Sequence, residues 1–474
     1  MSELFNMNIK ELLKNDFESL EKSIFEYVCE AGKRITVYIL EELDKYLMDN
    51  RDKKRYKSKQ SRKTTIKTVY GEVEYSRRMY LDINTNKYVY LLDEDMQMQK
   101  VGTISTNLAK KIADAAMDMS FRKAAKNISE NTGQSISSHG VWNAVQQIGS
   151  VIQAEEEQML VEMKAEQPRG DIESKIIFQE ADGVYLKMQK NKKKVKSQEL
   201  KLSTVYTGWE KDGDKLHQKK VYAGMETGKK FNEKTEALIQ SVYNIDEAEL
   251  RVVNGDGAAW IKNTYEPERI FQLDRFHIKK EIRRCIPEKH ICADALYKFE
   301  HLEIDGMLHV IETYINSIDD GSNSNKIKLA NNLYSYLKSN YDGLMPWQIQ
   351  AGYIPEPPEG VVYKNMGIQE NQNCSLVTMR MKGRKMRWSE GGANNMAKLI
   401  YMKENGELDN IIEKHDGQIT LPRDLNFKDV LSSSKVKSKI GKGNKWIETI
   451  NVTVPLLQYP NGPYSKLLRN IQNG

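Results

Sequence analysis

Two aspartates, Asp182 and Asp256, each follow an apolar run and each precede a glycine. The runs "SKIIFQEA" and "ELRVVNG" predict strands, and the active-site residues of sheet proteins gather where strands end. Asp-Gly is also a favoured turn dipeptide, so for either aspartate alone a turn is the simpler explanation. Gly255 and Gly257 would allow a sharp turn at Asp256 and a close approach of a ligand. Two roles therefore stay open for each aspartate, turn former and metal ligand.

A third acid, Glu370, stands at the head of a predicted helix in "GIQENQNCSLVTMRMKGRKMR". Two hard divalent cations need carboxylate oxygens that converge from different elements, and three acids on separate elements can supply them. Glu390, in "RWSEGG", is a rival for the third position. The later part of the segment is basic and offers phosphate contacts from Arg380, Lys382, Arg384 and Arg387.

The segments around these acids predict the elements that must position them. Residues 170–282 show three strands, a helix, a strand, a helix and a strand, which indicates a mixed α/β sheet covered by helices. Residues 283–360 lose the strand pattern and predict an all-helical insertion, closed by the rigid linker "PEPPEG". Helical spacing resumes over 361–425, and residues 426–474 have the composition of a basic tail.

The first hundred residues predict two further elements. Residues 1–60 have helical spacing divided at Gly32, which indicates a helical hairpin or one long broken helix. Within residues 61–100, alternation of apolar and polar residues around Gly71 predicts a β-hairpin.

Residues 101–165 have the outline of a helix-turn-helix. "SFRKAAKNISENTG" ends in a glycine and "SISSHGVWNAVQQIG" begins with serine caps, so a short turn joins two short helices. The second helix would present Ser137, His139 and Asn143 near its N-terminal end, where recognition helices meet base edges. An ordinary helical hairpin explains this pattern equally well.

The charge distribution favours a polyanionic partner. The 474-residue chain has a net charge of +6, with basic clusters at 51–67, 187–201 and 380–387. Each cluster alone is explained by a solvated face or a connector, but three together indicate nucleic acid. Trp260, Trp347 and Trp388 are most simply core residues, and of these three Trp388, in "KMRWSE", is the best placed to stack on DNA.

Several other classes of protein are disfavoured. The four cysteines are too few for a disulfide framework, and Cys285, His290 and Cys292 lack a nearby fourth zinc ligand. No window approaches the roughly 18 consecutive apolar residues of a membrane span. The N-terminus has acids where an export signal needs a basic region. We therefore expect a cytoplasmic protein without a membrane partner.

The chain resembles the ISLre-type insertion-sequence transposases and, more distantly, the Mutator-type transposases with a DDE catalytic core. The resemblance rests on "EADGVYLKMQ", "VVNGDGAAWIK", "FQLDRFHIKKEI" and "GIQENQN…RMKGRKMRWSEGGANNMAKL", in that order, and covers residues 60–405. It implies an RNase H-like core with a helical insertion before the last catalytic helix. It also implies a nucleoid-associated enzyme that acts on the double-stranded DNA of element ends and target, as a homodimer or a higher synaptic oligomer.

The same resemblance assigns roles to particular residues. Asp182, Asp256 and Glu370 would be the catalytic acids and would bind two Mg²⁺ or Mn²⁺ ions. Asp274 and His277 match the family's D-x-x-H motif and would orient DNA or support the site.

Two rival functions stay open. One is a DNA-binding protein whose acids have become structural. The other is a related RNase H-like nuclease acting on branched or hybrid nucleic acid.

Overall fold

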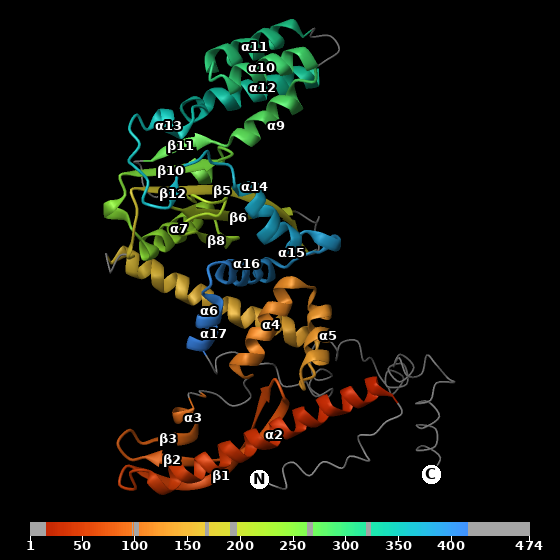
Figure 1. The fold of residues 1–474 in the computed structure, drawn as a ribbon, viewed down its shortest axis with the longest axis vertical. Coiled ribbons are helices and arrows are strands. Elements are labelled where there is room, and N and C mark those ends of the chain that lie inside the picture. Colours follow the sequence, from red (N-terminus) through yellow and green to blue (C-terminus); the bar gives the residue numbers. More distant parts are fainter. Residues whose placement is uncertain are drawn as a thin grey trace, which may run out of the picture. The chain divides into compact units, whose positions relative to one another are not determined.

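The described residues include a five-stranded mixed sheet (Figure 1). The computed structural model describes residues 16–96, 98, 104–165, 170–189, 197–262, 269–318 and 324–415. Strands β5 (Ile176–Lys187), β6 (Ser197–Tyr206) and β8 (Lys220–Gly224) pair antiparallel, whereas β10 (Leu250–Gly255) and β11 (Ile270–Leu273) continue the sheet in parallel with β5. The order β11-β10-β5-β6-β8 confirms the predicted mixed α/β sheet.

Other elements cover both faces of this sheet. The reason is that β5 directs apolar side chains to both faces, and both must be shielded from water. On one face Ile177 and Tyr243 pack with residues of α7 (Gly228–Val242). On the other face Phe178 packs among the aromatic rings of Trp209 and Trp347.

The segment after β11 contains helices in its described residues, as predicted. These are α9 (Arg275–Cys285), α10 (Lys289–Glu300), α11 (Ile304–Ser317) and α12 (Ser324–Ser339). They enclose a hydrophobic core of their own, which includes Phe299, Met307, Ile311 and Leu337. The chain returns to β11 through a 3-10 turn, Tyr341–Leu344, and the short helix α13 (Trp347–Gln350).

The N-terminal helix α2 (Phe17–Asn50) is continuous, and neither a hairpin nor a break occurs at Gly32. A side chain at Gly32 would collide with the ring of Tyr70, so this glycine allows a close contact between helix and hairpin. The predicted hairpin around Gly71 is present, but it starts earlier than expected. The basic cluster at 51–67 mostly forms its first strand, β1 (Tyr56–Thr68), which pairs with β2 (Gly71–Asp82). The small strand β3 (Lys87–Val89) and helix α3 (Leu91–Asp95) follow.

Three helices follow the hairpin: α4 (Thr106–Asp118), α5 (Phe121–Asn131) and α6 (Ser138–Lys164). The prediction of two short helices is wrong for α6, which has 27 residues. Its apolar spacing continues from Ile148 to Ile152, beyond the expected end at Gly149, and the helix packs against α16 (Glu390–Glu404) and α7. The last described helix is α17 (Leu408–Lys414).

Short elements complete the described chain. They are β4 (Ile172–Glu173), β7 (Trp209–Glu210), β9 (Tyr243–Asn244), a 3-10 turn (Ile245–Glu247), α8 (Ala259–Lys262), β12 (Val361–Val362), α14 (Gln369–Gln372), a π-helical turn (Asn373–Thr378), α15 (Met379–Met381) and a 3-10 turn (Gly383–Lys385). The described helices include none long and apolar enough to cross a membrane. The expected basic tail, 426–474, lies outside the described residues.

A buried ionic network joins α6, α7, α16 and the end of β8. The Nζ atom of Lys398 lies 2.8 Å from both Glu156 and Glu226, and Lys234 lies 2.7 Å from Glu156. Lys398 is completely buried and Glu156 is nearly so. Each charge is therefore compensated by a partner at hydrogen-bond distance, as buried ions require.

Replacing the central cation should destabilise the protein strongly. Lys398→Ala would leave the carboxylates of Glu156 and Glu226 to share Lys234 alone, and we expect a loss of about 3–5 kcal/mol in the free energy of unfolding. Lys403, also on α16, forms a half-exposed ion pair with Asp114, so Lys403→Ala should cost less than about 1 kcal/mol. Urea unfolding at neutral pH measures both, and equal losses would contradict the central role of Lys398.

Candidate active site

Three aspartates lie in one row across neighbouring strands. In the parallel part of the sheet, Ala181 pairs with Gly255, and Gly255 pairs with Leu273. The residue that follows each of these three along the sequence is an aspartate: Asp182, Asp256 and Asp274. Adjacent strands are about 4.8 Å apart, so the row brings the two predicted catalytic aspartates and the D-x-x-H aspartate together.

Asp182 is the most perturbed acid of the row. Its pKa is raised to about 6, mainly by burial; the charges of Asp256 and Asp274 contribute to the rise, and the hydrogen bond from Gly183 and the charge of His277 oppose it. One carboxylate oxygen accepts a hydrogen bond from the backbone N–H of Gly183 at 2.7 Å. Strongly perturbed carboxyl groups among other charges are typical of functional sites.

Asp256 acts as a turn former in this structure. Its Oδ1 accepts a hydrogen bond from the backbone N–H of Ala258 at 2.9 Å, and Gly257 adopts a positive φ of 85°. Tyr336, from α12, donates its hydroxyl to the carbonyl of Asp256 at 2.7 Å. The helical insertion therefore supports the turn that carries this acid.

Asp274 and His277 form an ion pair at the start of α9. Asp274 accepts hydrogen bonds from the backbone N–H and from Nδ1 of His277, both at 2.9 Å. The hydrogen bond to Asp274 raises the pKa of His277, and the charges of Asp182 and Asp256 add to this effect. Hydrogen bonds from His277 and Asn254 lower the pKa of Asp274 in spite of its burial. When protonated, His277 offsets part of the negative charge of the row.

A second row of polar side chains lies two residues before the aspartates along the same three segments. Glu180, Asn254 and Gln272 stand on adjacent strands in register and point to the same face as the acids, because side chains alternate with period two. The amide of Asn254 donates to Glu180 at 2.9 Å, and that of Gln272 donates to Asn254 at 3.2 Å. Sequence reasoning missed this row, although its period-two relation to the aspartates could have indicated it.

Glu180 links the sheet to the helical segment that carries Glu370. This carboxylate is fully buried and accepts hydrogen bonds from the hydroxyl of Tyr206 at 2.6 Å and from the backbone N–H groups of Gly367 and Ile368 at 3.0–3.1 Å. Burial raises its pKa, and these hydrogen bonds act in the opposite direction. Glu180 therefore fixes where the helix of residues 369–381 begins.

The face of this helix that meets the acids presents an amide. Asn373 donates from Nδ2 to Oδ2 of Asp182 at 2.6 Å, whereas Glu370, three residues earlier, is exposed. Glu390, the rival acid, is exposed in the first turn of α16. Among the residues that the structure describes, no three His, Cys, Asp or Glu side chains converge closely enough to hold a metal ion. Asp182 and Asp256 are brought together, but a third acid is not placed with them.

The predicted DNA contacts have different environments. Arg380 is 7% exposed, and its Nε donates to the carbonyl of Ala116 at 2.7 Å, so it acts within the core. Lys382 and Arg387 are exposed. The side chain of Arg384 lies outside the described residues.

At the start of α6, Ser137 is the N-cap and accepts from the N–H of Gly140 at 3.0 Å. His139 is exposed and stacks on Trp142, with the ring centroids 5.5 Å apart, and Asn143 is half-buried. The exposed start of α6 is thus compatible with contacts to a ligand. Cys285 is buried in the core of the helical insertion, and Cys292 is half-buried.

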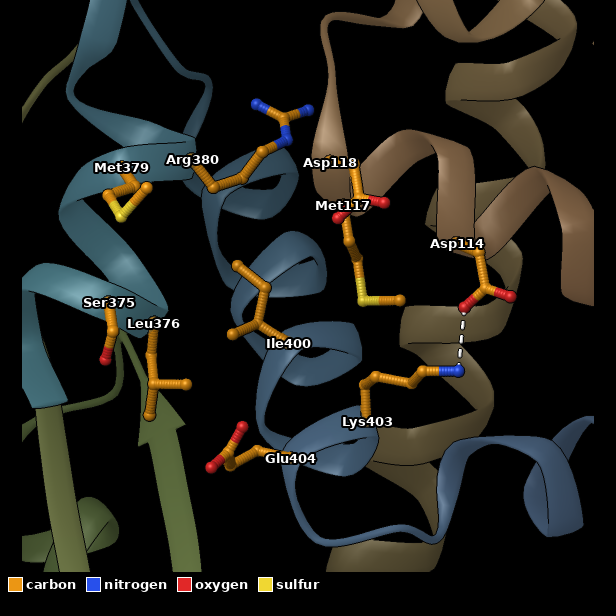
Figure 2. A pocket seen from close by; sticks show the side chains of 10 residues that line it. All are labelled: Asp114, Met117, Asp118, Ser375, Leu376, Met379, Arg380, Ile400, Lys403 and Glu404. Carbon is orange, nitrogen blue, oxygen red and sulfur yellow. Dashed lines mark ion pairs between the residues drawn. The ribbon is translucent and has the colours of Figure 1, made fainter. Parts of the chain in front are cut away.

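A cavity of about 600 Å³ lies between α4, the π-helical turn and α16, away from the acid row (Figure 2). Its charged residues include Asp114 and Lys403, which form an ion pair at 2.9 Å across it. Asp182, Asp256 and Asp274 do not line this cavity. Two of its charged residues, Asp114 and Lys403, neutralise each other, so we place the candidate chemistry at the row of aspartates instead.

Removing the charge of Asp182 should stabilise the protein at alkaline pH. Because the folded-state pKa of about 6 exceeds the ordinary value of 3.8, Asp182 contributes stability below about pH 4 that is lost as pH rises through 6. Asp182→Asn imitates the protonated form of Asp182. At pH 8 its free energy of unfolding should therefore exceed that of the wild type by about 1–2 kcal/mol, after allowance for partial exposure of the side chain. Near pH 4, denaturant unfolding should give the two proteins the same free energy of unfolding. A destabilised variant at pH 8 would contradict this account.

Replacing Glu180 should loosen the helix of residues 369–381. Glu180→Gln places an amide N–H₂ against groups that donate, so we expect a loss of about 2–4 kcal/mol in stability. Hydrogen exchange at the amides of Gly367 and Ile368 should accelerate. The matched control is Glu370→Gln, an exposed residue on the same helix, which should change neither measurement. Identical behaviour of the two variants would overturn the proposed anchoring by Glu180.

The chain matches the uncharacterised protein family UPF0236 over residues 10–416. A UPF0236 protein of Caldanaerobacter subterraneus subsp. tengcongensis, whose name carries eleven locus designations, is 24% identical over 413 residues, covering 85% of this chain and 82% of the relative. A UPF0236 protein "in vanSb 3'region" of Streptococcus gallolyticus is 21% identical over 406 residues, covering 82% of this chain and 83% of the relative. The chain therefore belongs to the uncharacterised family UPF0236.

Proposed function

We propose that this protein is a DNA transposase of a bacterial insertion sequence with an RNase H-like DDE catalytic core. The observation that carries the proposal is the row of Asp182 and Asp256 on adjacent strands, with the helix of residues 369–381 held against Asp182. Acids from two strands and one helix are the arrangement that phosphoryl transfer with two metal ions requires.

The sheet supports an RNase H-like core. Its first three strands form an antiparallel meander, and β10 and β11 extend the other side of β5 in parallel. A helical insertion then precedes the segment that carries Glu370, as the resemblance to ISLre-type transposases implies. Fold alone does not establish function, so the proposal depends on the acids.

The donor chemistry fits Mg²⁺ or Mn²⁺ at Asp182 and Asp256. Hard divalent cations prefer carboxylate oxygens, and the carboxylates of Asp256 and Asp274 are close enough to add to the rise that burial causes in the pKa of Asp182. Glu370 would supply the third carboxylate, one helical turn before Asn373. Bound ions would lower the pKa of an attacking water or 3′-hydroxyl and stabilise the leaving oxygen.

His277 would assist by binding DNA. Its raised pKa keeps a positive charge next to the acid row, and Asp274 fixes the orientation of its ring. An imidazolium in this position can contact a phosphate oxygen and so hold the strand in line with the acids. Exposed Lys382 and Arg387 would add phosphate contacts that do not depend on base sequence.

The names of the relatives also agree with a mobile element. One relative carries eleven locus designations and another from the same organism carries four. Many near-identical copies in one genome are expected of a sequence that moves. In this account the partners are the duplex DNA of the element ends and target, and a second copy of the chain, within the nucleoid of the cytoplasm.

A DNA-binding protein without catalysis is the second candidate, and one observation favours it. Asn373 occupies the position that faces Asp182, and Glu370 is exposed. Under this alternative the aspartates would be structural, as the turn at Asp256 already is. A related RNase H-like nuclease would cleave junctions or hybrids but would not join ends.

Cleavage assays on duplex DNA that carries the sequences flanking this chain's own gene test the proposal. The wild type should cut and join the ends with Mg²⁺, whereas Asp256→Asn should reduce cleavage by about 100-fold or more while binding persists. Asp212→Asn, at an exposed Asp-Gly turn, is the matched control and should cleave normally. Binding without cleavage by the wild type would favour the second candidate, and cleavage without joining would favour the nuclease.

A further inference from the structure

A cavity of about 300 Å³ lies at the N-terminal ends of α5, α6 and α16. Aromatic side chains supply much of its wall: Phe121, Trp142 and Trp388. Trp388 is 7% exposed and donates its indole N–H to the carbonyl of Met381 at 2.9 Å, so its ring is a fixed wall. Trp388 thus occupies the core, which was the simpler of its two predicted roles, and does not offer a free ring for stacking. Trp142 is half-buried and is the better candidate.

The surroundings of this cavity are electropositive. Arg380 and Arg387 line it, and its lining includes no acid among the described residues. Ser120 and Ser389 also line it, and they are the N-caps of α5 and α16. The partial positive ends of two helices therefore meet at an aromatic pocket, and helix N-termini attract phosphate groups.

We infer that this cavity binds an unpaired nucleotide of the DNA substrate, an inference that rests on the proposed function. The base would stack on Trp142 next to Phe121, and its phosphate would lie near Arg387 and the two helix ends. A base inside a duplex cannot enter a side-chain pocket, so the nucleotide must be unpaired.

The pocket is separate from the acid row. Gln189 donates its backbone N–H to the carbonyl of Trp388 at 2.7 Å, and it stands seven residues after Asp182 along the same stretch of chain. At about 3.3 Å per residue the two sites are roughly 20 Å apart. The pocket would therefore hold a nucleotide away from the scissile bond and fix the path of the strand.

Trp142→Ala tests the inference with the full chain and two labelled single strands, oligo(dT) and an abasic strand of equal length. Stacking of one base corresponds to about 5-fold or more in affinity. We expect fluorescence anisotropy to show that loss for oligo(dT), with the abasic strand unaffected. Trp142→Phe should retain most of the affinity, because it keeps a stacking surface. Tyr353→Ala, exposed in a distant loop, is the matched control, and unchanged melting temperatures would show that the variants are folded.

The outcomes separate the two proposals. If the wild type binds both strands but Trp142→Ala weakens both equally or neither, the pocket does not hold a base, and the transposase proposal is untouched. If the wild type binds neither these strands nor duplex DNA, both proposals fail.

Discussion

One buried carboxylate, Glu180, determines how the helix of residues 369–381 meets the sheet. Its two oxygens accept hydrogen bonds from four donors: Tyr206, Asn254, Gly367 and Ile368. A buried charge is tolerated only when such partners satisfy it, so sheet and helix are held at one relative position. Asn373 then reaches Asp182 two residues further along β5. The geometry of the candidate site follows from this anchor.

Above the anchor, the site has an unbalanced charge. Three aspartates share one row. His277, which is hydrogen-bonded to Asp274, is the group whose positive charge lowers the pKa of Asp182. Burial raises the pKa of Asp182, and the charges of Asp256 and Asp274 add to the rise, so the ionised carboxylate costs stability at neutral pH. A protein that keeps such an arrangement gives up stability for a site that attracts cations, the pattern expected where function opposes folding. The helical insertion contributes by fixing the Asp256 turn through Tyr336.

Much of the fold could be predicted from sequence, because the elements have strong periodicity. The strands around Asp182 and Asp256, the helical insertion and the hairpin at Gly71 were all indicated by local patterns. The length of α6 was not, because its second half is specified by packing on α16 and not by a capping signal. Asp256 could be selected because it follows β10. Asp182 was expected to follow a strand as well, but it lies inside β5, which continues to Lys187 because its pairing with β6 extends that far. The roles of Glu180, Asn254 and Asn373 could not be predicted, since they depend on which strands become neighbours. Nor could the burial of Arg380, which lies in a run of basic residues that looks uniformly exposed.

The central claim is that Asp182, Asp256 and the helix of residues 369–381 form one divalent-cation site. Fe²⁺ bound at a Mg²⁺ site reduces added hydrogen peroxide to hydroxide and a hydroxyl radical and is itself oxidised to Fe³⁺. The radical cleaves the polypeptide nearby, and mass spectrometry locates the cuts. We predict cuts near residues 182, 256 and 370, suppressed by excess Mg²⁺ and absent in Asp182→Asn. Cuts near residue 390 in place of 370 would assign the third acid to Glu390. Cleavage elsewhere, or cleavage that Mg²⁺ does not suppress, would contradict the claim.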